Sequence, residues 1–265
     1  MKKMRLDRLI VERGLAPTRE KAKRLILAGE VLVDETPAEK PGTMVASDVI
    51  TRLRHPVSPY VGRGGEKLAG ALSDLRIHVE GLRVLDIGAS TGGFTDCLLQ
   101  QGAGHVTALD VGKGQLDWKL RCDPRVTVIE GVNARRLEPN DFPERFDLVT
   151  IDVAFISLSK ILPATVPLLR SGGRVLALVK PQFELSREEI DRGGVVRDAE
   201  KHLRAVTRVI ASAQDSGLFV EDVAASRITG IEGNREFFLL MRRGEAANSD
   251  IARLQERARR VCQQE

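Results

Sequence analysis

Four ionisable residues lie at positions where a charged side chain would need a polar or charged partner. Asp152 and Lys180 each end an apolar run, and Glu236 comes directly before another. A charged side chain joined to a buried strand is costly unless polar or charged groups surround it. With Lys67, at the start of a helical stretch, these residues supply charges of both signs. They predict either a reactive centre that orients a polar substrate or a buried network of ion pairs.

A glycine-rich stretch is typical of a site that holds a nucleoside-like ligand. Residues 83–94, R-V-L-D-I-G-A-S-T-G-G-F, read as a buried strand, a tight turn and the start of a helix. Such a turn lets the backbone approach a ligand, and the helix start offers free N–H groups. Asp86 in the apolar part needs a polar partner. The next apolar strand, 106–109, ends in Asp110, where a carboxylate can accept both hydroxyls of a ribose.

The elements around these residues alternate between strands and helices. We expect strands at 84–87, 106–109, 126–130, 146–153, 174–180, 218–224 and 237–242, and helices at 68–75, 94–99, 115–121, 158–169, 199–214 and 251–261. This order predicts an α/β fold with a doubly wound, mostly parallel sheet. Ligands of such sheets bind beyond the carboxyl ends of the strands, so the charged residues should meet at one edge.

The first 60 residues differ from the rest in charge. Residues 1–29 carry nine Lys/Arg and three Asp/Glu, a net +6, whereas the remaining chain carries −2. We expect two helices at 4–9 and 18–28, with Thr18 as N-cap, and short strands at 31–33 and 49–53. A basic head indicates a polyanionic partner. Prolines from about residue 55 predict a linker, and hence domains at 1–60 and 61–265.

The basic head resembles a known RNA-binding module. R-L-D-R-L at 5–9 and T-R-E-K-A-K-R-L-I-L-A-G-E-V-L-V at 18–33 are similar to the αL motif shared with small-subunit ribosomal protein S-four. Asp34 and Glu35 replace the Asn-Gly turn that usually follows. The resemblance implies that the second helix lies against structured RNA. The RNA contacts we expect are Arg5, Arg8, Arg19, Lys21, Lys23, Arg24 and, in the following domain, Arg63.

The rest of the chain resembles a family of methyltransferases. D-x-G-x-S-x-G-G at 86–93 is similar to motif I of S-adenosylmethionine (SAM) dependent methyltransferases, and the order Lys67, Asp152, Lys180, Glu236 resembles the K-D-K-E tetrad of FtsJ-type ribose 2′-O-methyltransferases. The blocks G-R-G-G-E-K-L, D-V-G-K-G-Q-L, F-I-S-L and L-V-K-P-Q-F-E resemble the TlyA family, which couples an αL module to an FtsJ-like domain. Its members methylate cytidines of ribosomal RNA, and many carry a haemolysin label. Gly62 and Ala154 replace serines usual in the family.

The resemblance implies a cofactor and a role for each site residue. SAM would contact Asp86, Gly88, Ser90, Thr91, Gly92, Gly93, Phe94, Asp110, Val111, Asn133 and Asp152. Lys180 would act as base or close contact of the ribose hydroxyl, with Lys67 and Glu236 orienting it and Asp152 holding it near the methyl group. A lysine that accepts a proton must be uncharged, which burial beside a second cation favours.

Other classes of protein fit the sequence less well. The glycine spacing is not the G-x-G-x-x-G of NAD-dependent dehydrogenases. No apolar run approaches the roughly 20 residues of a membrane span, and no signal-peptide core follows the basic start. Cys97, Cys122, Cys262 and the four histidines have no metal-ligand spacing. We therefore expect a cytoplasmic protein with no metal and no membrane partner, acting on ribosomal RNA or ribosomal subunits. An RNA-binding or ribosome-assembly protein without turnover stays open, and a membrane-lytic haemolysin is less favoured.

Overall fold

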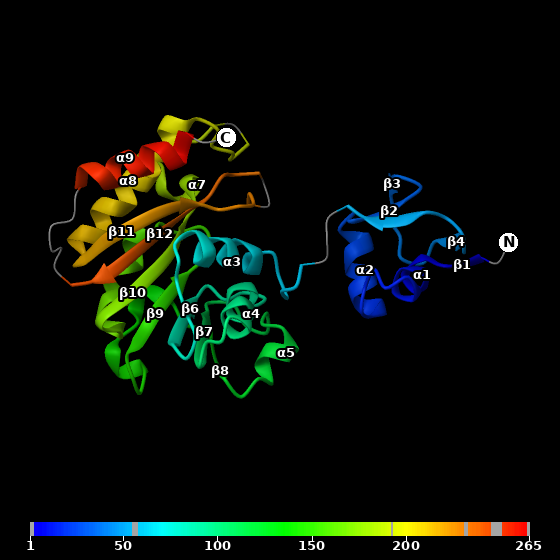
Figure 1. Ribbon diagram of the computed structural model, residues 1–265, viewed down its shortest axis with the longest axis horizontal. Coiled ribbons are helices and arrows are strands. Elements are labelled where there is room, and N and C mark those ends of the chain that lie inside the picture. Colours follow the sequence, from blue (N-terminus) through cyan, green and yellow to red (C-terminus); the bar gives the residue numbers. More distant parts are fainter. Residues whose placement is uncertain (1–2, 55–57, 192, 231–232, 245–250, 264–265) are drawn as a thin grey trace. The chain divides into compact units, whose positions relative to one another are not determined.

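The computed structural model describes residues 3–54, 58–191, 193–230, 233–244 and 251–263. The chain forms two compact units, Met1–Pro59 and Tyr60–Glu265 (Figure 1). Residues 55–57 of the expected linker lie outside the described residues.

The small unit is built from two helices and two small antiparallel sheets. Its elements are β1 (Lys3–Arg5), α1 (Leu6–Glu12), α2 (Arg19–Leu27), β2 (Val31–Val33), β3 (Thr36–Pro37), β4 (Met44–Ala46) and β5 (Thr51–Leu53). Strand β1 pairs with β4, and β2 lies between β3 and β5. Leu6, Ile10, Ala22, Ile26 and Val31 form its core.

The starts of the two helices and the turn after β2 can each be compared with the sequence. The hydroxyl of Thr18 accepts a hydrogen bond from the backbone N–H of Lys21 at 3.2 Å, so Thr18 is the N-cap of α2 as expected. The expected helix at 4–9 is wrong at its start, because Met4 pairs with Val45 in β1–β4 and the helix begins at Leu6. Asp34 and Glu35 both have positive φ, 48° and 63°, so they form the tight turn in place of Asn-Gly.

The large unit alternates strands and helices along the chain. Its first half contains α3 (Gly64–Asp74), β6 (Arg83–Ile87), α4 (Gly93–Gln100), β7 (His105–Asp110), α5 (Trp118–Arg121), β8 (Val126–Glu130), η1 (Ala134–Arg136) and η2 (Pro139–Asp141). Its second half contains β9 (Phe146–Ile151), η3 (Leu158–Lys160), α6 (Leu162–Thr165), η4 (Val166–Leu168), β10 (Leu169–Val179), α7 (Pro181–Glu184), α8 (Ala199–Asp215), β11 (Leu218–Ala225), β12 (Phe237–Arg243) and α9 (Ile251–Gln263).

The strands form one seven-stranded sheet in the order β11-β12-β10-β9-β6-β7-β8. The five strands from β10 to β8 are parallel, and β12 runs antiparallel to both of its neighbours. This confirms the doubly wound, mostly parallel sheet. The strand order reverses between β6 and β9, which is where ligands bind in such sheets.

Helices cover both faces of this sheet, and the strands alternate accordingly. Leu85 and Val149 pack in the core that includes α8 and α9, whereas their neighbours Val84 and Leu148 pack in the core that includes α3 and α4. In Figure 1 these two helix pairs lie on opposite sides of the strands. The sheet is therefore fixed by apolar packing on both faces, and its carboxyl edge is left to polar residues.

Several expected boundaries are wrong. The helix expected at 158–169 is divided into η3, α6 and η4, because Pro163 and Pro167 cannot donate helical hydrogen bonds. Strand β9 ends at Ile151 rather than at residue 153, and β10 begins at Leu169 rather than at 174. Helix α5 begins at Trp118 rather than at 115. Within the described residues, none of the helices has the length and apolar character needed to cross a membrane.

Candidate functional site

Two ion pairs lie at the carboxyl edge of the large sheet. Lys180 follows β10 and Asp152 follows β9, and Lys180 Nζ lies 2.6 Å from Asp152 Oδ1. Lys67 Nζ, from α3, lies 2.5 Å from Glu236 Oε2, just before β12. Their side chains are at most one-fifth exposed. All four expected reactive residues are thus brought together in pairs of opposite charge.

A cavity of about 470 Å³ opens beside these pairs. Lys67, Asp152 and Lys180 line it, whereas Glu236 contacts Lys67 without lining the cavity. The other lining residues are Arg63, Gly64, Gly88, Ala89, Ser90, Thr91, Gly93, Phe94, Ala154 and Thr229. The glycine turn and three of the four ionisable residues therefore face the same space.

The shape of the glycine turn depends on close backbone contacts. Gly88 has φ +84°, and a Cβ atom there would lie 2.2 Å from the carbonyl oxygen of Asp152. Gly92 has φ +98° and is the N-cap residue that precedes α4. Any side chain at Gly88 would push the turn away from the loop that carries Asp152. The turn and the ion pair are therefore packed as one unit.

Asp110 supports the turn from the end of β7. Its Oδ2 accepts a hydrogen bond from the N–H of Ser90 at 2.8 Å, and its Oδ1 accepts one from Gly112 at 2.7 Å. A carboxylate has about four acceptor positions, so two remain for hydroxyl groups. Val111 is exposed, and Asn133 follows Val132, whose N–H binds the Asp110 carbonyl oxygen. These three expected cofactor residues do not line the cavity.

Asp86 lies beneath the turn rather than in the cavity. It is fully buried, and its carboxylate accepts hydrogen bonds from the hydroxyls of Thr95 at 2.7 Å and Thr150 at 2.8 Å. These are the polar partners that its position requires. Burial raises the pKa of Asp86 to about 6, although both threonines oppose the shift. Asp86 ties β6 to α4 and β9, and so fixes the base of the turn.

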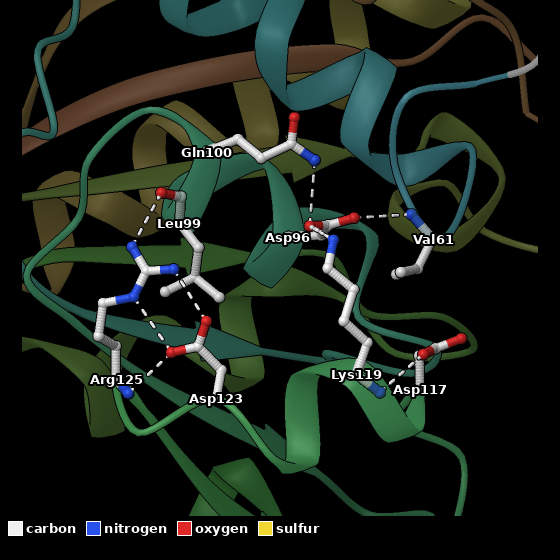
Figure 2. Close-up of polar contacts among 8 residues, drawn as sticks. All are labelled: Val61, Asp96, Leu99, Gln100, Asp117, Lys119, Asp123 and Arg125. Carbon is white, nitrogen blue, oxygen red and sulfur yellow. Dashed lines mark hydrogen bonds and ion pairs between the residues drawn. The ribbon is translucent and has the colours of Figure 1, made fainter.

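A second buried carboxylate fixes the segment that leads to Lys67. Figure 2 shows Asp96, on the first turn of α4, accepting hydrogen bonds from the N–H of Val61 at 2.9 Å and from Lys119 at 3.2 Å. Gln100 donates to the same carboxylate at 3.1 Å. This contact holds the start of the large unit against the helix that follows the glycine turn.

An exposed aromatic residue beside the cavity was missed by the sequence analysis. The side chain of Phe155 is 91% exposed and its φ is +62°, a costly conformation for a bulky residue. Its ring centroid lies 5.2 Å from that of Phe183. Ala154, which precedes it, lines the cavity. The signals in the sequence were its place three residues after Asp152 and its position as the first residue of the F-I-S-L block.

The expected RNA contacts of the small unit differ in what they bind. Arg5 and Arg19 both pair with the fully buried Asp7, at 3.1 and 2.9 Å. The hydrogen bond from Arg5 is the largest cause that lowers the pKa of Asp7 to about 2. In the described part of the chain, Lys21 and Arg24 have no carboxylate within ion-pair distance.

Of the remaining expected RNA contacts, two lie near a carboxylate of their own helix and one lies at the cavity. Arg8 lies 4.0 Å from Glu12, and Lys23 lies 3.7 Å from Glu20. Arg63 of the large unit lines the cavity and donates to the Thr229 carbonyl oxygen at 3.4 Å. Across the residues the structure describes, no three His, Cys, Asp or Glu side chains are grouped as a metal site would require.

Comparison with known proteins gives matches for both units. Residues 60–243 match the FtsJ-like methyltransferase family, and residues 4–49 match the S4 domain. The chain is 46% identical to the 16S/23S rRNA (cytidine-2′-O)-methyltransferase TlyA of Mycobacterium tuberculosis, over 91% of this chain and 90% of that protein. It is 42% identical to a hemolysin-like protein of Streptococcus thermophilus, whose structure covers 98% of this chain and 96% of its own with a TM-score of 0.77. A SAM-dependent methyltransferase of Mesorhizobium loti, 19% identical with a TM-score of 0.52 over 69% of this chain and 100% of its own, shares the fold.

The burial of Asp86 generates a prediction about stability and pH. Because its pKa is higher in the folded than in the unfolded chain, the native state holds the extra proton between about pH 4 and pH 6. Stability therefore falls as pH rises through this window, by about 3 kcal/mol at most from this group. Asp86→Asn should remove this component. In urea unfolding followed by circular dichroism, the variant should gain stability relative to wild type from pH 4 to pH 7.

The control for this measurement is Glu80→Gln, which removes an exposed carboxylate of the same unit. It should keep the wild-type dependence on pH. A stability difference between Asp86→Asn and wild type that stays constant from pH 4 to pH 7 would contradict the raised pKa.

Proposed function

The chain belongs to the FtsJ-like methyltransferases that carry an N-terminal S4 domain, and on this premise we propose that it methylates ribose 2′-hydroxyls of ribosomal RNA with SAM as methyl donor. The observation that carries the proposal is that the glycine turn and Lys67, Asp152 and Lys180 line the same cavity. The relative from Mycobacterium tuberculosis acts on cytidines of 16S and 23S RNA, so we propose cytidines in one or both ribosomal subunits, in the cytoplasm.

The cofactor would lie along the carboxyl edge from β9 to β8. The turn from Gly88 to Gly93 would hold its methionine part, and the free acceptor positions of Asp110 would bind its ribose hydroxyls. Val111, exposed beside Asp110, would contact the adenine, with Asn133 as a polar neighbour. This arrangement would place the methyl group in the cavity beside Asp152.

Methyl transfer would use the two ion pairs to orient the acceptor hydroxyl. The 2′-oxygen forms a bond to the methyl carbon while the carbon–sulfur bond breaks, which leaves S-adenosylhomocysteine and releases the hydroxyl proton. Lys180 would take that proton with its amine in the uncharged form, after losing the proton that it carries in the ion pair, and Asp152 Oδ1 lies 2.6 Å from that amine. Lys67, held by Glu236, would help to orient the hydroxyl. Because SAM is already activated, most of the acceleration would come from orientation.

The RNA would be bound by both units, with the small unit supplying affinity rather than chemistry. Lys21 and Arg24 on α2 are available for phosphates because they carry no carboxylate partner among the residues described. Arg63 at the cavity would bind a phosphate near the target nucleotide. Phe155, three residues after Asp152, offers an exposed ring suited to stack on a nucleobase.

Asp110→Ala tests the cofactor site. Loss of a charged acceptor that also holds the glycine turn should weaken SAM binding by about tenfold or more, measured by isothermal titration calorimetry. Asp123→Ala, which removes a carboxylate paired with Arg125, serves as the control and should bind SAM as wild type does. Equal affinities for wild type and Asp110→Ala would remove Asp110 from the proposed site.

Lys180 variants test methyl transfer itself. Lys180→Ala should lower turnover on ribosomal RNA by about a hundredfold or more, with SAM and RNA binding retained. Lys180→Arg can keep the ion pair with Asp152 but cannot accept a proton, so it should also be inactive. The measurement is transfer of labelled methyl from SAM to RNA, with melting temperatures for both variants.

The exposed Lys160 provides the matched control, and Lys160→Ala should retain turnover. An active Lys180→Arg variant would show that Lys180 only balances Asp152. An unmethylated RNA with wild-type enzyme would favour the alternative of an RNA-binding protein without turnover.

The RNA-binding role of α2 is tested by charge reversal at Lys21 and Arg24, which have no carboxylate partner among the residues described. Lys21→Glu with Arg24→Glu should weaken RNA binding and reduce the slope of log affinity against log salt by about two. Arg19 is left unchanged because its reversal would also place a second anion beside the buried Asp7. Lys40→Glu, an exposed reversal outside α2, is the control. RNA affinity equal to wild type at several salt concentrations would show that this face does not bind RNA.

A further inference from the structure

A third carboxylate joins the two loops that carry Asp152 and Lys180. Glu184 ends α7, four residues after Lys180. Its Oε2 accepts a hydrogen bond from Ser157 Oγ at 2.6 Å, and its Oε1 accepts one from the N–H of Leu158 at 2.8 Å. Burial raises the pKa of Glu184, although both hydrogen bonds oppose the shift. A carboxylate is tolerated in this poorly hydrated position because each of its two oxygens accepts a hydrogen bond.

The contacts between the two loops follow one another in order along the chain. Lys180 pairs with Asp152, the ring of Phe183 lies against that of Phe155, and Glu184 binds the start of η3. Between the first and last of these contacts, Phe155 adopts its left-handed conformation. Such a conformation is costly for a bulky residue and persists only where surrounding contacts impose it. Glu184 closes the loop on the far side of Phe155 and thereby supplies that restraint.

We propose that Glu184 is a positioning residue for methyl transfer. It does not line the cavity, and it acts by holding residues 152–158 so that Asp152 and Phe155 stay in place against Lys180. Without its carboxylate, the N–H of Leu158 loses its acceptor, the hydroxyl of Ser157 keeps only its contacts with Ser159, and Phe155 relaxes to an extended conformation. A displacement of about 1 Å in a reacting group can lower a rate about a hundredfold. The inference rests on the proposed methyl transfer.

Two substitutions separate positioning from charge. Glu184→Ala removes both hydrogen bonds. Glu184→Gln keeps them without the charge, because its amide oxygen can accept from Leu158 and its amide nitrogen can donate to Ser157 Oγ. Glu188→Ala removes an exposed carboxylate from the following loop and is the matched control.

The first measurement is single-turnover methyl transfer at saturating SAM and RNA, expressed per SAM-binding site. Glu184→Ala should lower the rate about tenfold or more, while its dissociation constant for SAM stays within about twofold. Glu184→Gln should stay within about threefold of wild type, and Glu188→Ala should match it. A Glu184→Ala rate equal to wild type would overturn the proposal. So would an equal loss in Glu184→Gln, since that would assign the effect to the charge.

The second measurement, amide hydrogen exchange over residues 152–160, does not depend on turnover. Glu184→Ala should speed exchange in this segment, Leu158 included, while Glu184→Gln and Glu188→Ala should not. Unchanged exchange in Glu184→Ala would also overturn the positioning role. If wild type does not methylate RNA but exchange responds as expected, the failure belongs to the proposed reaction and the loop restraint stands.

Discussion

The pairing of opposite charges at the carboxyl edge of the large sheet is the interaction on which the site depends. Asp152 and Lys180 meet because β9 and β10 are adjacent and parallel, so their ends reach the same edge. Strand β12 is antiparallel to β10 with Val179 opposite Phe237, and this register places Glu236 at that edge as well. Each charge is retained in a poorly hydrated place because a partner of opposite sign lies within hydrogen-bond distance. The apolar layers on both faces of the sheet make this edge the place where such a cluster can open to solvent.

The glycine turn is held from below by groups that do not reach the cavity. Asp86 uses its whole carboxylate on Thr95 and Thr150, and its raised pKa means that the ionised form destabilises the fold at neutral pH. A threonine pair is a weak compensation for a fully buried anion. The residue that fixes the shape of the site therefore lowers the stability of the unit around it, as is common at functional sites.

Much of the fold could be predicted because long apolar runs indicate buried strands, and three of the four charged residues, Asp152, Lys180 and Glu236, lie next to the ends of such runs. Which charged side chain pairs with which could not be predicted in the same way. Lys67 and Glu236 are 169 residues apart and meet only because β12 inserts antiparallel beside β10. The division of the helical segment that starts at Leu158 could have been predicted from its prolines. The left-handed backbone of Phe155 could not, because it is imposed by contacts with another loop.

Charge counting along the chain also misjudges which cations are available. The net +6 of residues 1–29 includes Arg5 and Arg19, whose guanidinium groups enclose the buried Asp7 and so stabilise the small unit. Such arginines are fixed by the fold before any partner arrives. In the large unit the two lysines of the tetrad are likewise paired with carboxylates of the protein, and the two positive and two negative charges sum to zero. Attraction for a polyanion must therefore come from cations without internal partners. The geometry of the reaction depends instead on cations that are held by such partners.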